Sequence, residues 1–144
     1  MGYKLIALDM DGTLLRKDKT VSERTKKAIE DARKKGVTVV LATGRPIDGV
    51  TKYLEELDMY GENDYVLSYN GGLVLKTKNR EPICKIGLTG EDLHYLYEIS
   101  KELGVNIHAF SETKGLITPK NSKYTEVEAN INNIKINIQI LEQE

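Results

Sequence analysis

Two short apolar segments with an amphipathic helix between them constrain the fold of this chain most. The segments are YKLIAL, residues 3–8, and VTVVLA, residues 37–42. Unbroken apolar runs of this length are typical of strands that are buried on both faces in a parallel sheet. Between them, Ser22 predicts the start of a helix over residues 23–35 and Gly36 predicts its end. A strand, a helix and a strand joined by short connections predict a right-handed βαβ unit.

The rest of the chain continues this pattern and then changes it. Pro46 suits the first turn of a second helix over residues 46–57, and residues 64–76 read as a hairpin around an Asn-Gly turn. Five further elements are expected: a strand within 81–88, a helix over 90–103 with Thr89 and Asp92 as its capping pair, strands within 105–110 and 115–119, and a half-buried strand over 134–140. The sequence therefore predicts an α/β part followed by an α+β part, with a boundary near residues 69–85.

The composition narrows the classes of partner. The chain has 144 residues, enough for one domain with a core, and a net charge of −1. The absence of a basic excess argues against a nucleic-acid partner, and no apolar run or signal-peptide layout indicates a membrane. The single Cys84 excludes an intrachain disulfide, and two histidines argue against a zinc site. We expect a cytoplasmic protein.

Two aspartates one residue apart follow the first apolar segment, in LIALDMDGTLL, residues 5–15. Side chains at the carboxyl end of a parallel strand face the crevice where open α/β sheets bind ligands. Residues two apart in an extended chain face the same side, so Asp9 and Asp11 can converge on one cation. Carboxylates suit Mg²⁺, while Gly12 allows a sharp turn and Thr13 adds a hydroxyl. The alternative interpretation is an ordinary capped turn after a strand.

A second loop follows the second apolar segment, in VVLATGRP, residues 39–46. Thr43 and Gly44 supply a hydroxyl and backbone N–H groups, and Arg45 supplies a guanidinium just before the expected helix. These groups bind anions. Carboxylates on one strand end and anion donors on the next predict phosphoryl transfer through an aspartyl phosphate, assisted by a metal ion.

Three motifs together carry a family resemblance. LIALDMDGTLL, VVLATGR and SYNGG resemble the haloacid dehalogenase superfamily of phosphatases, in its Cof-type branch. The resemblance implies that Asp9 is the nucleophile and a ligand of Mg²⁺. It implies that Asp11 is the general acid and then the base, with its backbone carbonyl also on the metal.

The same resemblance implies a set of phosphate- and substrate-binding residues and a domain division. The binding residues are Met10, Gly12, Thr13, Thr43, Gly44, Arg45 and Asn70. For Asn70 a plain hairpin turn is an equally good interpretation. Residues 1–80 correspond to the Rossmann-like core of the family, present only in part, and residues 81–144 to the beginning of an α+β cap domain. The implied substrate is a small phosphorylated metabolite.

Two later motifs of the family have no counterpart in this chain. One is a lysine that neutralises the phosphoaspartate, and the other is a GDxxxD-type acidic pair; the chain contains no Gly-Asp dipeptide. We therefore expect a truncated member with weak activity or none, because each lost electrostatic group typically costs about 100- to 1000-fold in rate. The alternatives are a non-catalytic phosphate-binding remnant and, ranked last, a receiver-like domain. Exposed sheet edges would favour self-association.

Overall fold

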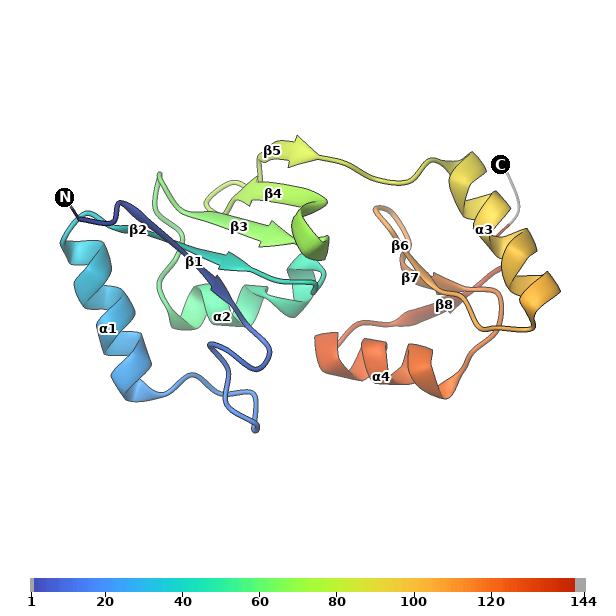
Figure 1. Cartoon of the computed structure of the whole chain (residues 1–144), viewed down its shortest axis with the longest axis horizontal. Coiled ribbons are helices and arrows are strands. Elements are labelled where there is room, and N and C mark those ends of the chain that lie inside the picture. Colours follow the sequence, from blue (N-terminus) through green and yellow to red (C-terminus); the bar gives the residue numbers. More distant parts are fainter. Residues whose placement is uncertain (1, 142–144) are drawn as a thin grey trace. The chain divides into compact units, whose positions relative to one another are not determined.

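The computed structural model describes residues 2–141 and divides the chain into two compact units, Met1–Ile86 and Gly87–Glu144. The first unit is built around a five-stranded sheet with the order β1-β2-β3-β4-β5 (Figure 1). Its strands are β1 (Leu5–Asp9), β2 (Thr38–Ala42), β3 (Tyr65–Ser68), β4 (Leu73–Lys76) and β5 (Pro82–Lys85). The first three strands are parallel and the last two are antiparallel to their neighbours. The predicted α/β fold with a parallel sheet is confirmed.

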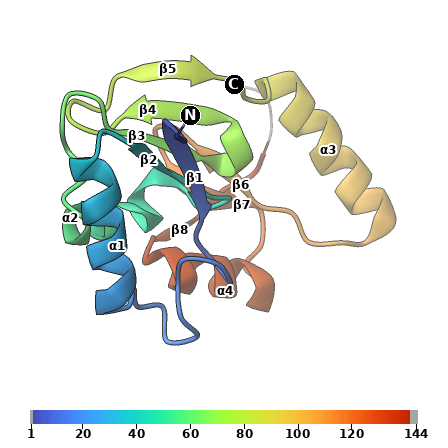
Figure 2. The ribbon, with the colours of Figure 1, turned by 60° about the vertical axis from the view of Figure 1, so that its left-hand side comes forward.

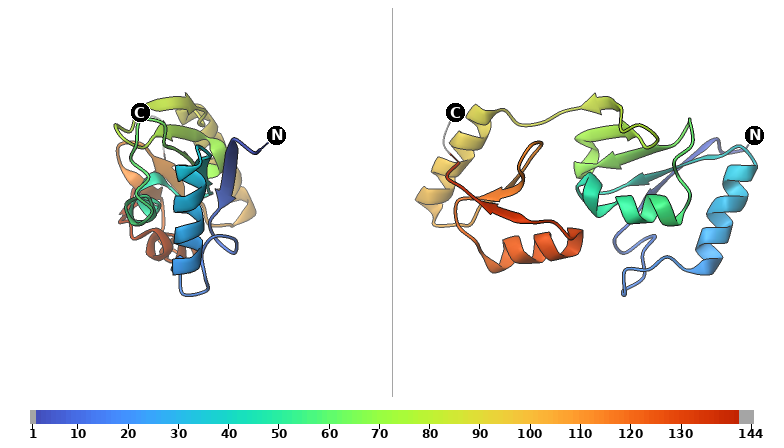
Figure 3. Two further views of the ribbon diagram at one scale, coloured as in Figure 1. Left: turned by 90° about the vertical axis from the view of Figure 1, so that its left-hand side faces the viewer. Right: turned by 180° about the vertical axis from the view of Figure 1, so that it is seen from behind.

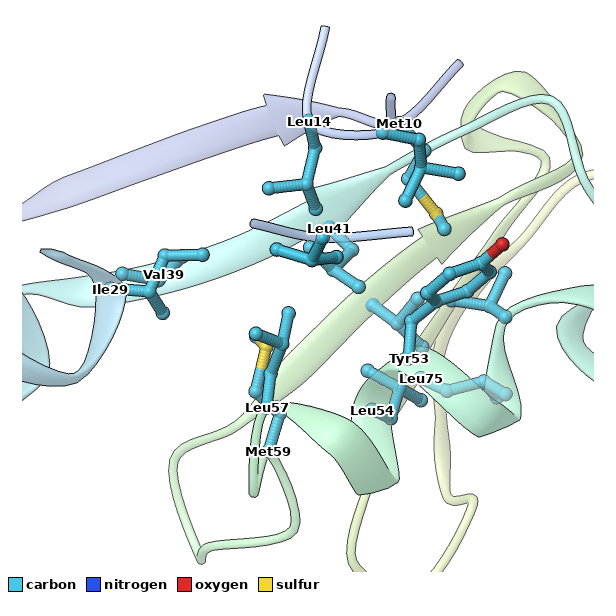
Figure 4. Packing of buried hydrophobic residues seen from close by; sticks show 14 residues of the cluster. Met10, Leu14, Ile29, Val39, Leu41, Tyr53, Leu54, Leu57, Met59 and Leu75 are labelled. Carbon is cyan, nitrogen blue, oxygen red and sulfur yellow. The ribbon is translucent and has the colours of Figure 1, made fainter. Parts of the chain in front are cut away.

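Two helices lie on the same side of this sheet, as right-handed crossovers between strands in the order β1-β2-β3 require (Figures 1 and 3). They are α1 (Glu23–Lys34) and α2 (Thr51–Glu56). Ser22 caps α1 as predicted, because its hydroxyl accepts a hydrogen bond from the Thr25 N–H. The core between helices and sheet is shown in Figure 4 and includes Met10, Leu14, Ile29, Val39, Leu41, Tyr53, Leu54, Leu57, Met59 and Leu75.

Strand β1 departs from the prediction of a buried strand. It is the border strand of the sheet, in the foreground of Figure 2, and pairs only with β2 among the described residues. Leu5 is 57% exposed and Ile6 is 37% exposed, although both belong to an unbroken apolar run. The apolar run correctly indicated a strand. It did not indicate how far the strand is buried, because burial depends on whether another strand covers its edge.

The segment after β2 also departs from the prediction. Instead of one helix over residues 46–57, a 3₁₀ turn (Ile47–Gly49) precedes α2. Glycine lowers helix stability at the junction, and the Gly49 carbonyl accepts a hydrogen bond from Arg45 Nη1 at 3.3 Å. The Arg45 side chain is thus hydrogen-bonded to a backbone carbonyl within the segment that was predicted to be one continuous helix.

The predicted hairpin is confirmed, with a longer turn than two residues. Strands β3 and β4 are joined by a 3₁₀ turn (Tyr69–Gly71), in which three consecutive residues have positive φ. Tyr69 and Asn70 are not glycines, so this backbone conformation needs support from its surroundings. The support comes from the preceding loop: the Tyr69 N–H donates to the Arg45 carbonyl and the Asn70 N–H to the Thr43 carbonyl.

The second unit holds a three-stranded sheet and two helices. The elements are α3 (Gly90–Leu103), β6 (Ala109–Ser111), β7 (Gly115–Thr118), α4 (Lys123–Asn132) and β8 (Ile136–Ile138), and the strand order is β6-β7-β8. Helix α3 begins with the predicted capping box and ends at Gly104 in the left-handed conformation. No described helix is both long and apolar enough to span a membrane.

The structure differs from the prediction in two places near the end of the chain. Helix α4 was not predicted, because its apolar residues form no clear stripe and its start is marked only by the Ser122 cap. The predicted strand over residues 134–140 is limited to β8, and Ile138 and Ile140 are exposed rather than buried. Alternation in the sequence indicated a strand but not a covered face.

Candidate active site

The carboxyl ends of β1, β2 and β3 lie at one edge of the sheet. In the strand register Asp9 is level with Ala42, and Ala42 is level with Leu67. The loops that follow these strands therefore start side by side. This places the DMDGT and TGR segments together, as the sequence predicted.

A pocket of about 270 Å³ opens between these loops. Its lining consists of Asp9, Ala42, Thr43, Gly44, Leu67, Asn70 and Gly71. Four of the predicted site residues are in this set: Asp9, Thr43, Gly44 and Asn70. A larger recess of about 550 Å³ lies in the second unit along residues 104–108 and Tyr124, and it contains none of the predicted residues. We take the pocket at Asp9 as the candidate site because of the side chains that line it, although the other cavity is larger.

The turn after β1 presents the carboxylate of Asp9. The Asp9 carbonyl accepts the Leu14 N–H, and Gly12 has a φ of 85°, so the chain turns back on itself within a few residues. The Thr13 hydroxyl donates to Asp9 Oδ2 at 2.9 Å. Its contact in this structure is therefore with the carboxylate. The Met10 side chain is fully buried in the core, so only its backbone can face a ligand.

Asp11 is held by two cations. Arg45 donates from Nε to Oδ2 at 2.7 Å and from Nη2 to Oδ1 at 2.8 Å, which is a bidentate pair. Lys19 Nζ lies 2.7 Å from Oδ1. The hydrogen bond from Arg45 is the largest cause that holds the pKa of Asp11 well below its ordinary range, and Lys19 adds to it. Asp11 is thus a carboxylate near neutral pH.

The loop after β2 is tied to the turn after β3. The Thr43 hydroxyl accepts a hydrogen bond from the Arg45 N–H at 3.2 Å, which leaves its own hydrogen available for an acceptor in the pocket. The Asn70 side chain packs against Gly44, where a Cβ would lie 2.9 Å from Asn70 Oδ1. The lack of a side chain at Gly44 therefore allows the Asn70 side chain to lie close to the preceding loop.

Two residues of the site were missed by sequence reasoning. Lys19 comes from a polar stretch with several other charged residues, and nothing in the sequence marks it as a partner of Asp11. Tyr53 lies in α2, and its hydroxyl donates to the Lys19 carbonyl at 3.0 Å. Arg45, which was expected near the substrate, contacts Asp11 in this structure, and its place near a substrate stays a prediction.

The oxygen donors at this edge fit part of a magnesium shell. Asp9 is exposed, and among the described residues only its Oδ2 has a hydrogen-bond partner, so Oδ1 is available to coordinate a cation. Both carboxylate oxygens of Asp11 are occupied by Arg45 and Lys19. No cluster of three metal-ligating side chains occurs within residues 2–141. One carboxylate with a backbone carbonyl suits Mg²⁺ when water and phosphate oxygens complete the shell.

Comparison with known proteins places this geometry in a family. The family model of haloacid dehalogenase-like hydrolases matches residues 6–144. The protein named "putative phosphatase YxeH" of Bacillus subtilis is 41% identical over 143 residues, which is 98% of this chain and 53% of that protein. The HMP-PP phosphatase of Yersinia pestis is 31% identical over 83% of this chain and 42% of its own length.

A solved structure agrees with these matches. A haloacid dehalogenase-like hydrolase from Bacteroides thetaiotaomicron superposes with a TM-score of 0.83 at 31% identity, over 96% of this chain and 52% of that chain. The chain thus spans about half the length of the relatives it matches.

Proposed function

This chain belongs to the haloacid dehalogenase-like hydrolase family, as its three motifs predicted, and on that premise we propose that it carries the nucleophile side of a phosphatase site. The observation that supports the proposal most is the pocket that Asp9 shares with Thr43 and Gly44. An accessible carboxylate faces anion-binding groups there, and this combination suits attack on a phosphate ester.

The proposed reaction has two steps. A carboxylate oxygen of Asp9 bonds to phosphorus while the bond from phosphorus to the alcohol oxygen breaks, and that oxygen takes up a proton. Water then bonds to phosphorus and gives up a proton, the Asp9–phosphorus bond breaks, and inorganic phosphate leaves. Thr43 and Gly44 are proposed to hold the phosphate oxygens through the hydroxyl and a backbone N–H.

Asp11 is proposed as the proton carrier for both steps. Its pairing with Arg45 and Lys19 favours the carboxylate, which suits the second step, where a base removes a proton from water. In the first step it must hold a proton. That role requires its contacts with the two cations to weaken when substrate binds.

Mg²⁺ is the proposed cofactor, held by Asp9 Oδ1 and the Asp11 backbone carbonyl. When bound, it would supply positive charge to the phosphate oxygens. Asp9 would remain oriented by the Thr13 hydroxyl in its presence.

Substrate class and domain roles are further parts of the proposal. We assign residues 1–80 to a catalytic core and residues 81–144 to the beginning of a cap, and we propose small phosphorylated metabolites as substrates. The names of the relatives support a phosphorylated substrate but no single compound.

A phosphate-binding module without turnover is the second candidate. The engagement of both Asp11 carboxylate oxygens by cations favours it, because a proton carrier that is locked as an anion cannot act as an acid. In that case the pocket binds a phosphate group and releases it unchanged.

The test is hydrolysis of p-nitrophenyl phosphate by the purified chain with and without Mg²⁺, beside Asp9→Asn. The matched control is Asp31→Asn, an exposed aspartate on α1. We expect Mg²⁺-dependent turnover that persists in Asp31→Asn and falls to background in Asp9→Asn. Equal rates in the chain and in Asp9→Asn would rule out the catalytic proposal, and calorimetric binding of inorganic phosphate would then support the second candidate.

A further inference from the structure

Tyr53 is a buried core residue whose hydroxyl group forms a hydrogen bond with a distant part of the chain. Its side chain is 1% exposed and packs within the core cluster. In Figure 4 its hydroxyl oxygen points away from α2, toward the side on which Met10 lies. That hydroxyl donates to the backbone carbonyl of Lys19, 34 positions earlier in the chain. One partly buried hydrogen bond therefore ties α2 to the loop that follows β1.

The loop that carries Lys19 is tightly turned. The Arg16 N–H donates to the Thr20 carbonyl and the Lys19 N–H donates to the Arg16 carbonyl, both at 2.9 Å. Lys19 has a φ of 63°, in the left-handed region that non-glycine residues seldom occupy. Such a residue keeps its conformation only where its surroundings determine it. Tyr53 supplies a hydrogen bond to the backbone of this residue from outside the loop.

Both cations that hold Asp11 are in contact with Tyr53. Lys19 is fixed through its backbone, and its ammonium reaches Asp11 Oδ1 at 2.7 Å. The guanidinium carbon of Arg45 lies 5.6 Å from the centre of the Tyr53 ring, within range of a cation–π interaction. The same guanidinium binds both oxygens of Asp11. Tyr53, Lys19, Arg45 and Asp11 thus form one connected network.

We propose that Tyr53 is a positioning residue that sets the orientation of the Asp11 carboxylate through Lys19 and Arg45. This inference rests on the proposed function, in which Asp11 carries the proton. Proton transfer depends on placement within a fraction of an ångström, and a displacement of about 1 Å can cost on the order of 100-fold in rate.

A purely structural role for Tyr53 makes a different prediction. Its ring fills the core whether or not the hydroxyl is present, so phenylalanine would serve the core equally well. Tyr53→Phe removes the hydrogen bond to Lys19 and keeps the ring under Arg45. Lys19→Met removes the ammonium group that contacts Asp11, and Lys19→Arg keeps a positive charge at that position.

The first measurement reads the carboxylate directly. In protein labelled with ¹³C-aspartate, the Asp11 carboxyl resonance is assigned by its loss in Asp11→Asn. We expect this resonance to move in Tyr53→Phe and in Lys19→Met, to stay closer to its original position in Lys19→Arg, and to remain unchanged in Tyr95→Phe, an exposed tyrosine on α3. A folded Tyr53→Phe protein with an unmoved Asp11 resonance would overturn the inference.

The second measurement separates binding from turnover. We expect kcat for p-nitrophenyl phosphate to fall roughly 10-fold in Tyr53→Phe with KM nearly unchanged, because the hydroxyl does not reach the pocket and affects only placement. An unchanged kcat with a moved resonance would also refute the positioning role. If the unmodified chain does not hydrolyse the ester, the proposed function fails, while the carboxyl resonance still decides whether Tyr53 orients Asp11.

Discussion

The closest fit in the site lies between Gly44 and the side chain of Asn70. A Cβ on Gly44 would lie 2.9 Å from Asn70 Oδ1, which is shorter than real Cβ contacts. The backbone of Asn70 is held by its hydrogen bond to the Thr43 carbonyl, so the side chain must yield instead. Because an amide at the end of a side chain can rotate, this clash should cost little free energy of unfolding. It should affect ligand binding more, because Asn70 lines the pocket.

Gly44→Ala is therefore expected to lower the free energy of unfolding by about 1 kcal/mol or less, with partial loss of phosphate affinity. Asn70→Gly in the same chain should recover most of the stability, because glycine tolerates the φ of 56° at that position. Urea unfolding of the two single variants and the double variant measures this coupling. Gly87→Ala is the matched control, since a Cβ there meets nothing within 4 Å. Additive losses in the double variant would contradict the contact.

At the residue scale, the sequence predicted the side chains that follow the strands but not those that hold them. Asp9, Thr43 and Gly44 could be predicted because the carboxyl ends of parallel strands meet at one sheet edge. Lys19 and Tyr53 could not, because their contact depends on the path of a polar loop and on the rotation of α2 about its axis. Neither is encoded in a local pattern.

At the element scale, helix α3 shows how much a local signal can determine. The Thr89 hydroxyl accepts the Asp92 N–H at 3.1 Å, while Asp92 accepts the Thr89 N–H at 2.8 Å and the Thr89 hydroxyl at 2.7 Å. The two residues are three positions apart, so their pairing could be predicted directly. Helix α4 has a cap at Ser122 as well, yet Val127 and Ile131 are exposed and no apolar stripe supported its prediction. The border position of β1 depends on neighbouring strands and lay beyond any local pattern.

The capping box of α3 gives a prediction for pH. Hydrogen bonds from the Thr89 N–H and hydroxyl lower the pKa of Asp92. A lowered pKa in the folded state means that the ionised box stabilises the helix above the ordinary aspartate value of about 3.9, and that this contribution is lost as the pH falls through the folded pKa. Asp92→Asn should reduce stability at neutral pH and weaken its decline in acid, as measured by urea unfolding at pH 7 and pH 3.

Glu91→Gln distinguishes the effect of the capping box on the stability of α3 from the effect of negative charge at the helix N-terminus. Glu91 lies in the same first turn of α3 and favours the helix N-terminus by its charge, but the box is formed by its neighbour. We expect Glu91→Gln to have the smaller effect at both pH values. Equal effects of the two substitutions would show that charge at the N-terminus, rather than the hydrogen bonds of the box, stabilises α3.

At the scale of the whole molecule, some of the exposed apolar side chains lie on border strands of the two sheets. In the first unit they are Leu5 and Ile6 on β1 and Ile83 on β5, and in the second unit Ile138 on β8. Border strands also present backbone N–H and C=O groups that can pair with another chain. The described part of β1 carries no proline or charged side chain before Asp9, so the usual protections against edge pairing are weak there.

Self-association through the β1 edge stays a prediction, and sedimentation velocity over a range of concentrations measures it. Covering the 37% of Ile6 that is exposed contributes about 0.6–1.1 kcal/mol in each copy, and a lysine there would also bury a charge, so Ile6→Lys should weaken the association constant about 10-fold. Leu103→Lys changes an apolar position on α3 that is 69% exposed and belongs to no strand, and it should leave association intact. Ile138→Lys tests the β8 edge in the same way. A chain that stays monomeric at every concentration would refute the prediction, and loss of association in Leu103→Lys alone would move the contact from the sheet edge to α3.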